Sequence, residues 1–232
     1  MSRLLISLSL VTALTSSVFA DRATPRFAQP PDTSVSSPVS SPAEYPITVK
    51  PDIMPIVDRA KVRAKLASNR AANLTRFRLY QAKGVFPSNV YSNKKLNVWL
   101  DEDGNYCAAA TIIQMSGNDD LAAMTAEDNN FVKLGAVKQG PLMDWILTSG
   151  LTQAEIAAIQ EPFMGVGGGR IQPNWESPPP VLITKRKAED QRLIKKYSQV
   201  EAQIVKNRDK SLDLATDRLM KNPTLAAALL AG

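Results

Sequence analysis

The residues with the greatest potential for chemistry lie in one short stretch, DEDGNYCAAAT, residues 101–111. Asp101, Asp103 and Asn105 carry the oxygen ligands that calcium binds. An EF-hand loop, however, requires glycine at position six and glutamate at position twelve. This stretch has glycine at position four and Ile112 at position twelve. The spacing therefore favours a turn, because Asp-Gly is a common turn dipeptide, and a looser calcium site is the alternative.

Cys107 is the only cysteine of the chain and the one thiol that could act as a nucleophile. A reactive thiol needs a base, a cation or a helix N-terminus to lower its pKa. The chain contains no histidine, which excludes a Cys-His pair, a Ser-His-Asp triad and a histidine-based zinc site. We therefore expect Cys107 to be a buried packing residue. A free thiol and a disulfide between two chains are the alternatives.

Carboxyl groups of the central region form a second candidate site. They are Asp101, Asp103, Asp119, Asp120, Glu127, Asp128 and Asp144. A glycosidase needs two such groups about 5–10 Å apart, and Asp101 or Asp103 together with Asp144 would supply them. Trp99 and Trp145 could stack on a sugar, although tryptophans are more often part of a core. Hydrolysis by a carboxylate pair therefore stays open as an alternative function.

Two further motifs have simpler explanations. The run GVGGGR, residues 165–170, lacks the lysine and hydroxyl residue of a phosphate-binding loop and precedes proline-rich chain, so it favours a flexible linker. The tripeptide that starts at Asn73 matches a glycosylation acceptor but lies within a predicted helix, so we interpret it as a chance match. The sequence predicts no metal and no cofactor.

The first part of the chain is a predicted export signal followed by a tether. Residues 1–20 combine a cation at Arg3, an apolar run and small residues at the end, which is typical of a signal peptide cleaved after Ala20. The apolar run is shorter than the roughly 20 residues of a spanning helix, so we expect no stable membrane anchor. Residues 21–54 are rich in proline and serine, which predicts a disordered tether.

Residues 55–161 are predicted to form a small, mainly helical domain. A helix is expected over residues 55–84, with an apolar face of Ile56, Ala60, Ala67, Ala71, Leu74 and Phe77. KLNVWL alternates like a short strand. YCAAATIIQM favours a helix capped by Asn105, with a second strand as the alternative. DDLAAMTAED and PLMDWILT are also predicted helices. Thr152 and Glu155 form a capping-box pattern in a predicted helical hairpin.

The C-terminal part is predicted to be a linker followed by helices. Residues 162–181 are rich in glycine and proline, as linkers are. Within residues 182–232, a long polar helix is expected over residues 183–221. Its broken heptad pattern allows coiled-coil self-association through residues 190–220. Asn222 is expected to cap a short apolar helix at the end.

Charge is unevenly distributed among these segments. Residues 58–83 hold eight Lys/Arg and one acid, residues 84–161 hold four Lys/Arg and ten acids, and residues 181–222 hold eleven Lys/Arg and six acids. Docking of the basic helices on the acidic centre is the favoured explanation, and an anionic partner is the alternative. A pI near 9.4 is common in nucleic-acid-binding proteins, but predicted export argues against a nucleic acid.

The segments NVWLDEDGNYCAAATII and GPLMDWILTSGLTQAEIAAIQ, within residues 70–161, resemble an uncharacterised family of exported bacterial proteins. The resemblance implies no activity, cofactor or catalytic residue. We therefore predict an exported, non-catalytic binding or scaffolding protein of the bacterial envelope, with another envelope protein or an anionic envelope polymer as partner. The alternative is a carboxylate-dependent hydrolase acting on an envelope polymer. The expected fold is mainly α, with at most one short strand pair and a long C-terminal amphipathic helix.

Overall fold

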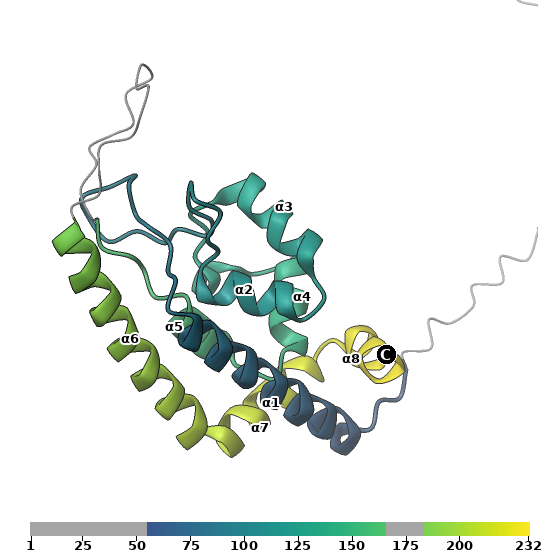
Figure 1. Ribbon diagram of the computed structural model, residues 1–232. Coiled ribbons are helices and arrows are strands. Elements are labelled where there is room, and N and C mark those ends of the chain that lie inside the picture. Colours follow the sequence, from purple (N-terminus) through teal and green to yellow (C-terminus); the bar gives the residue numbers. More distant parts are fainter. Residues whose placement is uncertain (1–54, 166–182) are drawn as a thin grey trace, which may run out of the picture. The chain divides into compact units, whose positions relative to one another are not determined.

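Helices dominate residues 55–165 and 183–232, which are the residues that the computed structural model describes (Figure 1). The elements are α1 (Arg59–Lys83), α2 (Ala108–Met115), α3 (Asp119–Asn129), the 3-10 turn η1 (Leu134–Ala136), α4 (Pro141–Thr148), α5 (Gln153–Ile159), α6 (Ile183–Lys206), α7 (Arg208–Leu219) and α8 (Pro223–Ala231). Within these residues, β pairing is limited to isolated bridges. The predicted mainly helical fold is confirmed.

Several predictions fall outside the described residues. They are the signal peptide over residues 1–20, the tether over residues 21–54 and most of the linker over residues 162–181. The first residues of that linker segment are described, and Phe163 among them is buried. Phe163 and Leu96 exchange backbone hydrogen bonds of 2.9 and 3.0 Å, which ties this segment to the domain.

Helix α1 begins four residues later than predicted. Asp58 occupies the cap position, and its carboxylate accepts hydrogen bonds from the backbone N–H groups of Ala60 and Lys61. The expected start at Pro55 is wrong, because the first good cap acceptor in this segment is Asp58. The predicted end is confirmed: Gly84 has a φ of +64° and closes the last turn.

The buried face of α1 also differs from the predicted one. Its buried residues are Val62, Leu66, Arg70, Asn73, Phe77 and Tyr80. Ile56, Ala60 and Ala71, which we expected on this face, are exposed. The prediction followed apolar residues only, whereas the observed stripe contains two polar residues that find partners inside the protein.

Helix α2 confirms that YCAAATIIQM is helical, but its first turn differs. The cap position belongs to Cys107, so the prediction of an Asn105 cap is wrong. Asn105 instead bonds to Asp101. The preceding KLNVWL segment is not a strand, because its pairing is limited to single bridges at Leu96 and Leu100. Its predicted alternation also fails, since the neighbours Val98 and Trp99 are both buried.

The helical hairpin of α4 and α5 follows the prediction closely. Pro141 occupies the first turn of α4. Thr152 caps α5, and the hydrogen bonds of a capping box connect it with Glu155 in both directions. Gly150 lies between the helices with a φ of +77°. Local signals therefore suffice to specify this part of the fold.

The predicted helix over residues 183–221 is wrong as a single element. It is interrupted at Asn207, which separates α6 from α7. The heptad residues divide accordingly, because Val205 is half exposed whereas Leu212 and Leu219 are buried. The short C-terminal helix is confirmed, with the side chain of Asn222 accepting a hydrogen bond at its start.

Helices α6 and α7 complete the core of the described residues. The larger core cluster joins α1, α2, α4 and α5 to Leu193, Tyr197, Val200 and Ile204 of α6. A smaller cluster joins Val62 and Leu66 of α1 to α7 and α8. The described residues 55–165 and 183–232 thus share one interior, in which α6 and α7 are docked on the preceding helices. Self-association through the remaining faces of residues 190–220 stays a prediction.

Candidate functional site

The loop after residue 100 forms a closed turn around Asp101. This carboxylate is buried and accepts hydrogen bonds from the backbone N–H groups of Ser88 (2.9 Å), Asp103 (3.0 Å) and Asn105 (2.8 Å). The side-chain amide of Asn105 adds another bond at 3.2 Å. Gly104 turns the chain with a φ of +80°. Both oxygens of Asp101 therefore hold the loop together, which agrees with the predicted turn.

The looser calcium site considered for this loop is not supported by the arrangement of its acidic side chains. In residues 55–165 and 183–232, no group of three histidine, cysteine, aspartate or glutamate residues is arranged to hold a metal ion. The side chain of Asp103 is exposed, so it does not join Asp101 in a buried cluster.

Cys107 lies in the interior, as expected from the sequence. It is 1% exposed, and its thiol is not in a disulfide. Burial raises the pKa of Cys107 to about 12, against an ordinary value of 9.0. Tyr80 and Tyr197 share this interior, and burial raises the pKa of each hydroxyl as well. This interior therefore favours the neutral forms of the Cys107 thiol and of the two tyrosine hydroxyls, so Cys107 cannot supply a thiolate nucleophile at neutral pH.

This burial predicts a loss of stability in alkali. The unfolded chain releases the Cys107 proton near the ordinary pKa, whereas the folded chain retains it until about pH 12. The free energy of unfolding should therefore fall from about pH 9 upward, by at most about 1.4 kcal/mol per pH unit for each such group. Urea titrations across this range should show a shallower decline for Cys107→Ala, with Tyr80 and Tyr197 contributing the remainder. An identical pH dependence in the variant would contradict the assignment.

The acids of the predicted carboxylate pair lie in different surroundings. Asp103 and Asp144 are exposed, whereas Asp101 is engaged in its turn. The two tryptophans are core residues rather than a sugar platform. The indole N–H of Trp99 donates to the carbonyl of Ala122 at 2.9 Å, and that of Trp145 donates to the hydroxyl of Ser116 at 3.0 Å.

Asn73 is also used within the fold. Its side chain is buried and donates to the carbonyl of Ser149 at 2.9 Å. Its amide oxygen accepts from the Arg76 guanidinium at 2.7 Å. These contacts agree with the interpretation of the glycosylation tripeptide as a chance match.

Sequence analysis missed the main buried polar network, which centres on Arg70. Its guanidinium forms two hydrogen bonds of 2.6 and 2.9 Å with the carboxylate of Glu155. It also donates to the backbone carbonyls of Gly150 (3.1 Å) and Ile204 (2.8 Å). Arg70 is 4% exposed. Its position within the apolar stripe of α1 is the signal that could have identified it.

Glu155 completes this network from the other side. Besides Arg70, it accepts hydrogen bonds from the N–H of Thr152 and from the hydroxyl of Ser211, both at 2.8 Å. Burial acts to raise the pKa of Glu155, but the hydrogen bonds from Arg70, Thr152 and Ser211 outweigh it and lower the pKa. One carboxylate therefore joins α1, α5 and α7 and stays ionised in the fold.

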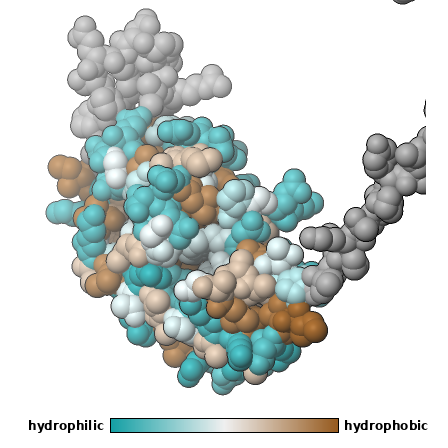
Figure 2. Space-filling model, turned by 90° about the vertical axis from the view of Figure 1, so that its right-hand side faces the viewer, coloured by the Kyte–Doolittle hydropathy of each residue, from teal (hydrophilic) through white to brown (hydrophobic). Residues whose placement is uncertain are grey.

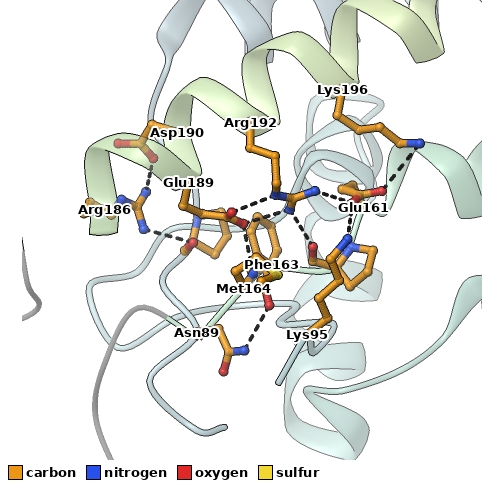
Figure 3. A network of polar contacts seen from close by, with 12 residues as sticks. Asn89, Lys95, Glu161, Phe163, Met164, Arg186, Glu189, Asp190, Arg192 and Lys196 are labelled. Atoms are coloured by element: carbon orange, nitrogen blue, oxygen red, sulfur yellow. Dashed lines mark hydrogen bonds and ion pairs between the residues drawn. The ribbon is translucent and has the colours of Figure 1, made fainter. Parts of the chain in front are cut away.

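A second network fixes the start of α6 (Figure 3). The Arg192 guanidinium bonds to Glu189 at 2.7 and 2.8 Å and to Glu161 at 2.5 Å. These two carboxylates raise the pKa of Arg192, with Glu189 as the larger cause. Glu189 also accepts from the N–H of Met164 at 2.9 Å. The charges of Arg192, Glu189 and Glu161 are thus paired with one another within the fold.

An apolar groove lies between the α4–α5 hairpin and α7. We call it the α5–α7 groove; its volume is about 460 Å³, and its lining includes Ile146, Leu147, Leu151, Leu214, Ala215, Asp217, Arg218 and Lys221. A second hollow of about 360 Å³ shares Thr152, Ala154 and Leu214 with it. Leu214 is 55% exposed. A third hollow of about 410 Å³ lies near Lys95. Asp101, Asp103 and Asp144 line none of these three hollows.

Charge at the α5–α7 groove is predominantly positive. Asp217 is paired with Arg59 at 2.6 Å. Arg218 and Lys221 also line the groove, and neither makes an ion pair with another residue in the described ranges. The arrangement can therefore hold an apolar group beside an anion.

Comparison of the chain with protein-family models, with curated proteins and with solved structures finds no match. The resemblance suggested for residues 70–161 therefore stays a prediction.

Proposed function

We propose that this chain is an exported, non-catalytic binding protein of the bacterial envelope, and that its α5–α7 groove holds an acidic amphipathic helix of another envelope protein. The apolar wall of the groove is the observation that carries the proposal. Leu214 stands at the junction of two adjoining hollows and is half exposed, although its neighbours Leu212 and Ala215 are buried. An apolar helix side chain would cover it.

Charge at the groove supports an acidic partner. Because Asp217 is engaged by Arg59, the groove presents Arg218 and Lys221 to its occupant. Leucine side chains flanked by glutamates would fill the apolar wall and pair with these cations. We favour binding over a carboxylate-dependent hydrolase because Asp101, Asp103 and Asp144 line none of the three hollows.

Replacing Leu214 with glutamate should weaken binding of such a helix by about tenfold or more, because an uncompensated charge would enter an apolar contact. The probe is a synthetic helical peptide with leucines on one face and flanking glutamates, measured by isothermal titration calorimetry. Ile194→Glu on α6 is the matched control. The exposed fraction of Ile194 is 54%, similar to the 55% of Leu214, but Ile194 does not line the groove. That variant should bind like the parent chain.

Charge specificity provides the second arm of this test. A peptide with the same leucines but flanking lysines should bind more weakly than the glutamate peptide. Equal affinity for both peptides, or unchanged affinity after Leu214→Glu, would refute the proposed groove. Turnover of envelope polysaccharides by the purified chain would refute the non-catalytic part of the proposal.

A further inference from the structure

Helix α8 has a composition that does not match its burial. From Leu225 to Ala231 it contains only leucine and alanine. Helices that are apolar on every side are normally buried in a large core or a membrane. In α8, however, only Ala226 is buried, whereas Ala228 and Ala231 are exposed and the leucines are partly exposed. Its outer side lacks a partner within the described ranges.

The start of the described chain extends this apolar surface. Val57 packs in the same small cluster as Leu225, Leu229 and Leu230 of α8. The preceding residue, Ile56, is fully exposed. Figure 2 shows apolar surface gathered on this side of the molecule, beside the point where the described chain begins. We call this surface, formed by Ile56, Val57 and the outer side of α8, the α8 face.

The start of α1, next to the α8 face, has a net positive charge: Arg59, Lys61, Arg63 and Lys65 face one acid, Asp58, whose carboxylate caps the helix. The acids of neighbouring α7 are engaged, because Asp217 pairs with Arg59 and Asp213 pairs with Arg63 at 2.6 and 2.8 Å. Lys61, in the first turn of α1, is exposed and makes no ion pair with a described residue. Residues 222–232 contain no acidic side chain.

We propose that the α8 face binds reversibly to the surface of an anionic lipid bilayer. An apolar helix beside cations can lie in the interface, with its side chains among the acyl chains and the cations near the phosphates. None of the described helices is long and apolar enough to span a membrane, and α8 has only nine residues. A second copy of the chain is a poorer occupant, because a symmetric contact would bring the same cations together.

Sedimentation with lipid vesicles tests this proposal on the full mature chain. Vesicles containing phosphatidylglycerol should bind the protein, and pure phosphatidylcholine vesicles should bind much less. The double variant Ile56→Glu/Ala228→Glu should lose at least about tenfold in affinity, because it places carboxylates in the lipid interface. Lys61→Glu should lose about fivefold or more. Ile56, Ala228 and Lys61 are all exposed, so thermal unfolding should be unchanged in both variants.

Met124→Glu on α3 is the matched control, because Met124 is an exposed apolar residue away from the α8 face. It should bind vesicles like the parent chain. Equal binding to both lipids, retention of binding by the double variant, or concentration-dependent dimers that the double variant abolishes would overturn the proposal. None of these substitutions lines the α5–α7 groove, so peptide binding there should persist whatever the vesicles show.

Discussion

Replacing Arg70 with leucine should lower the free energy of unfolding by about 3–5 kcal/mol. The substitution leaves the Glu155 carboxylate, whose side chain is only 12% exposed, without its ion-pair partner. It also removes the hydrogen bonds that the carbonyls of Gly150 and Ile204 accept. Breaking a buried pair costs more than the pair contributes, because the remaining charge stays desolvated. Urea denaturation followed by circular dichroism would measure the loss.

Arg78→Leu is the matched control for this prediction. Arg78 lies on the same helix and pairs with Glu201 at 2.7 Å, but its side chain is 53% exposed. Exposed ion pairs typically contribute less than about 1 kcal/mol, so this variant should remain close to the parent chain. Similar losses for Arg70→Leu and Arg78→Leu would show that the buried network is not the cause.

The pH dependence gives a second readout of the Arg70 network. Because the pKa of Glu155 is lowered in the fold, its contribution is present above the ordinary pKa of a glutamate. That contribution is lost as pH falls through the lowered pKa of the folded state. The stability difference between the parent chain and Arg70→Leu should therefore narrow in acid. A difference that stays constant with pH would argue for lost packing instead.

Replacing Gly150 with alanine should cost about 3–5 kcal/mol, from two causes that add. Gly150 has a φ of +77°, which residues with a side chain rarely adopt. A Cβ atom at this position would also overlap the carbonyl oxygen of Leu66 and lie 2.7 Å from the backbone nitrogen of Arg70. The hairpin would have to move away from α1, which would disturb the Arg70 network as well. The measurement is again the free energy of unfolding.

Gly117→Ala separates these two causes. Gly117 has a φ of +82°, close to that of Gly150, but a Cβ atom there would meet no other atom within 4 Å. This variant should therefore show only the backbone cost of about 1–2 kcal/mol. Equal losses at Gly117 and Gly150 would mean that the close approach of the hairpin to α1 has no energetic importance.

The parts of the fold that were predictable from the sequence are those with strong local signals. Pro141 starts α4, Thr152 caps α5, and Asn222 caps α8, each as expected. The turn at Asp101 was also predictable, because its chemistry lies within a few residues. Such signals depend on neighbours in sequence and need no knowledge of the tertiary structure.

The remaining features depend on contacts between distant segments. The buried face of α1 was predicted wrongly because Arg70 and Asn73 belong to it, and their partners lie on the hairpin and on α6. The break between α6 and α7 at Asn207 could not be predicted from a glycine or a proline, because neither residue occurs there. Ile204 lies in the last turn of α6, where carbonyls lack intrahelical donors, and Arg70 supplies one from α1. The α5–α7 groove also depends on distant segments, because residues 146–154 and 214–221 form its lining.

The position of Tyr197 has a consequence for the order in which the chain can fold. Its ring lies 5.6 Å from that of Phe77, 5.7 Å from Tyr80 and 5.5 Å from Phe86. Three aromatic rings near the beginning of the domain therefore lack a packing partner until Tyr197 is synthesised, more than a hundred residues later. Until α6 emerges, this interior stays incomplete. The aromatic part of the core can therefore close only after the chain has been made as far as Tyr197.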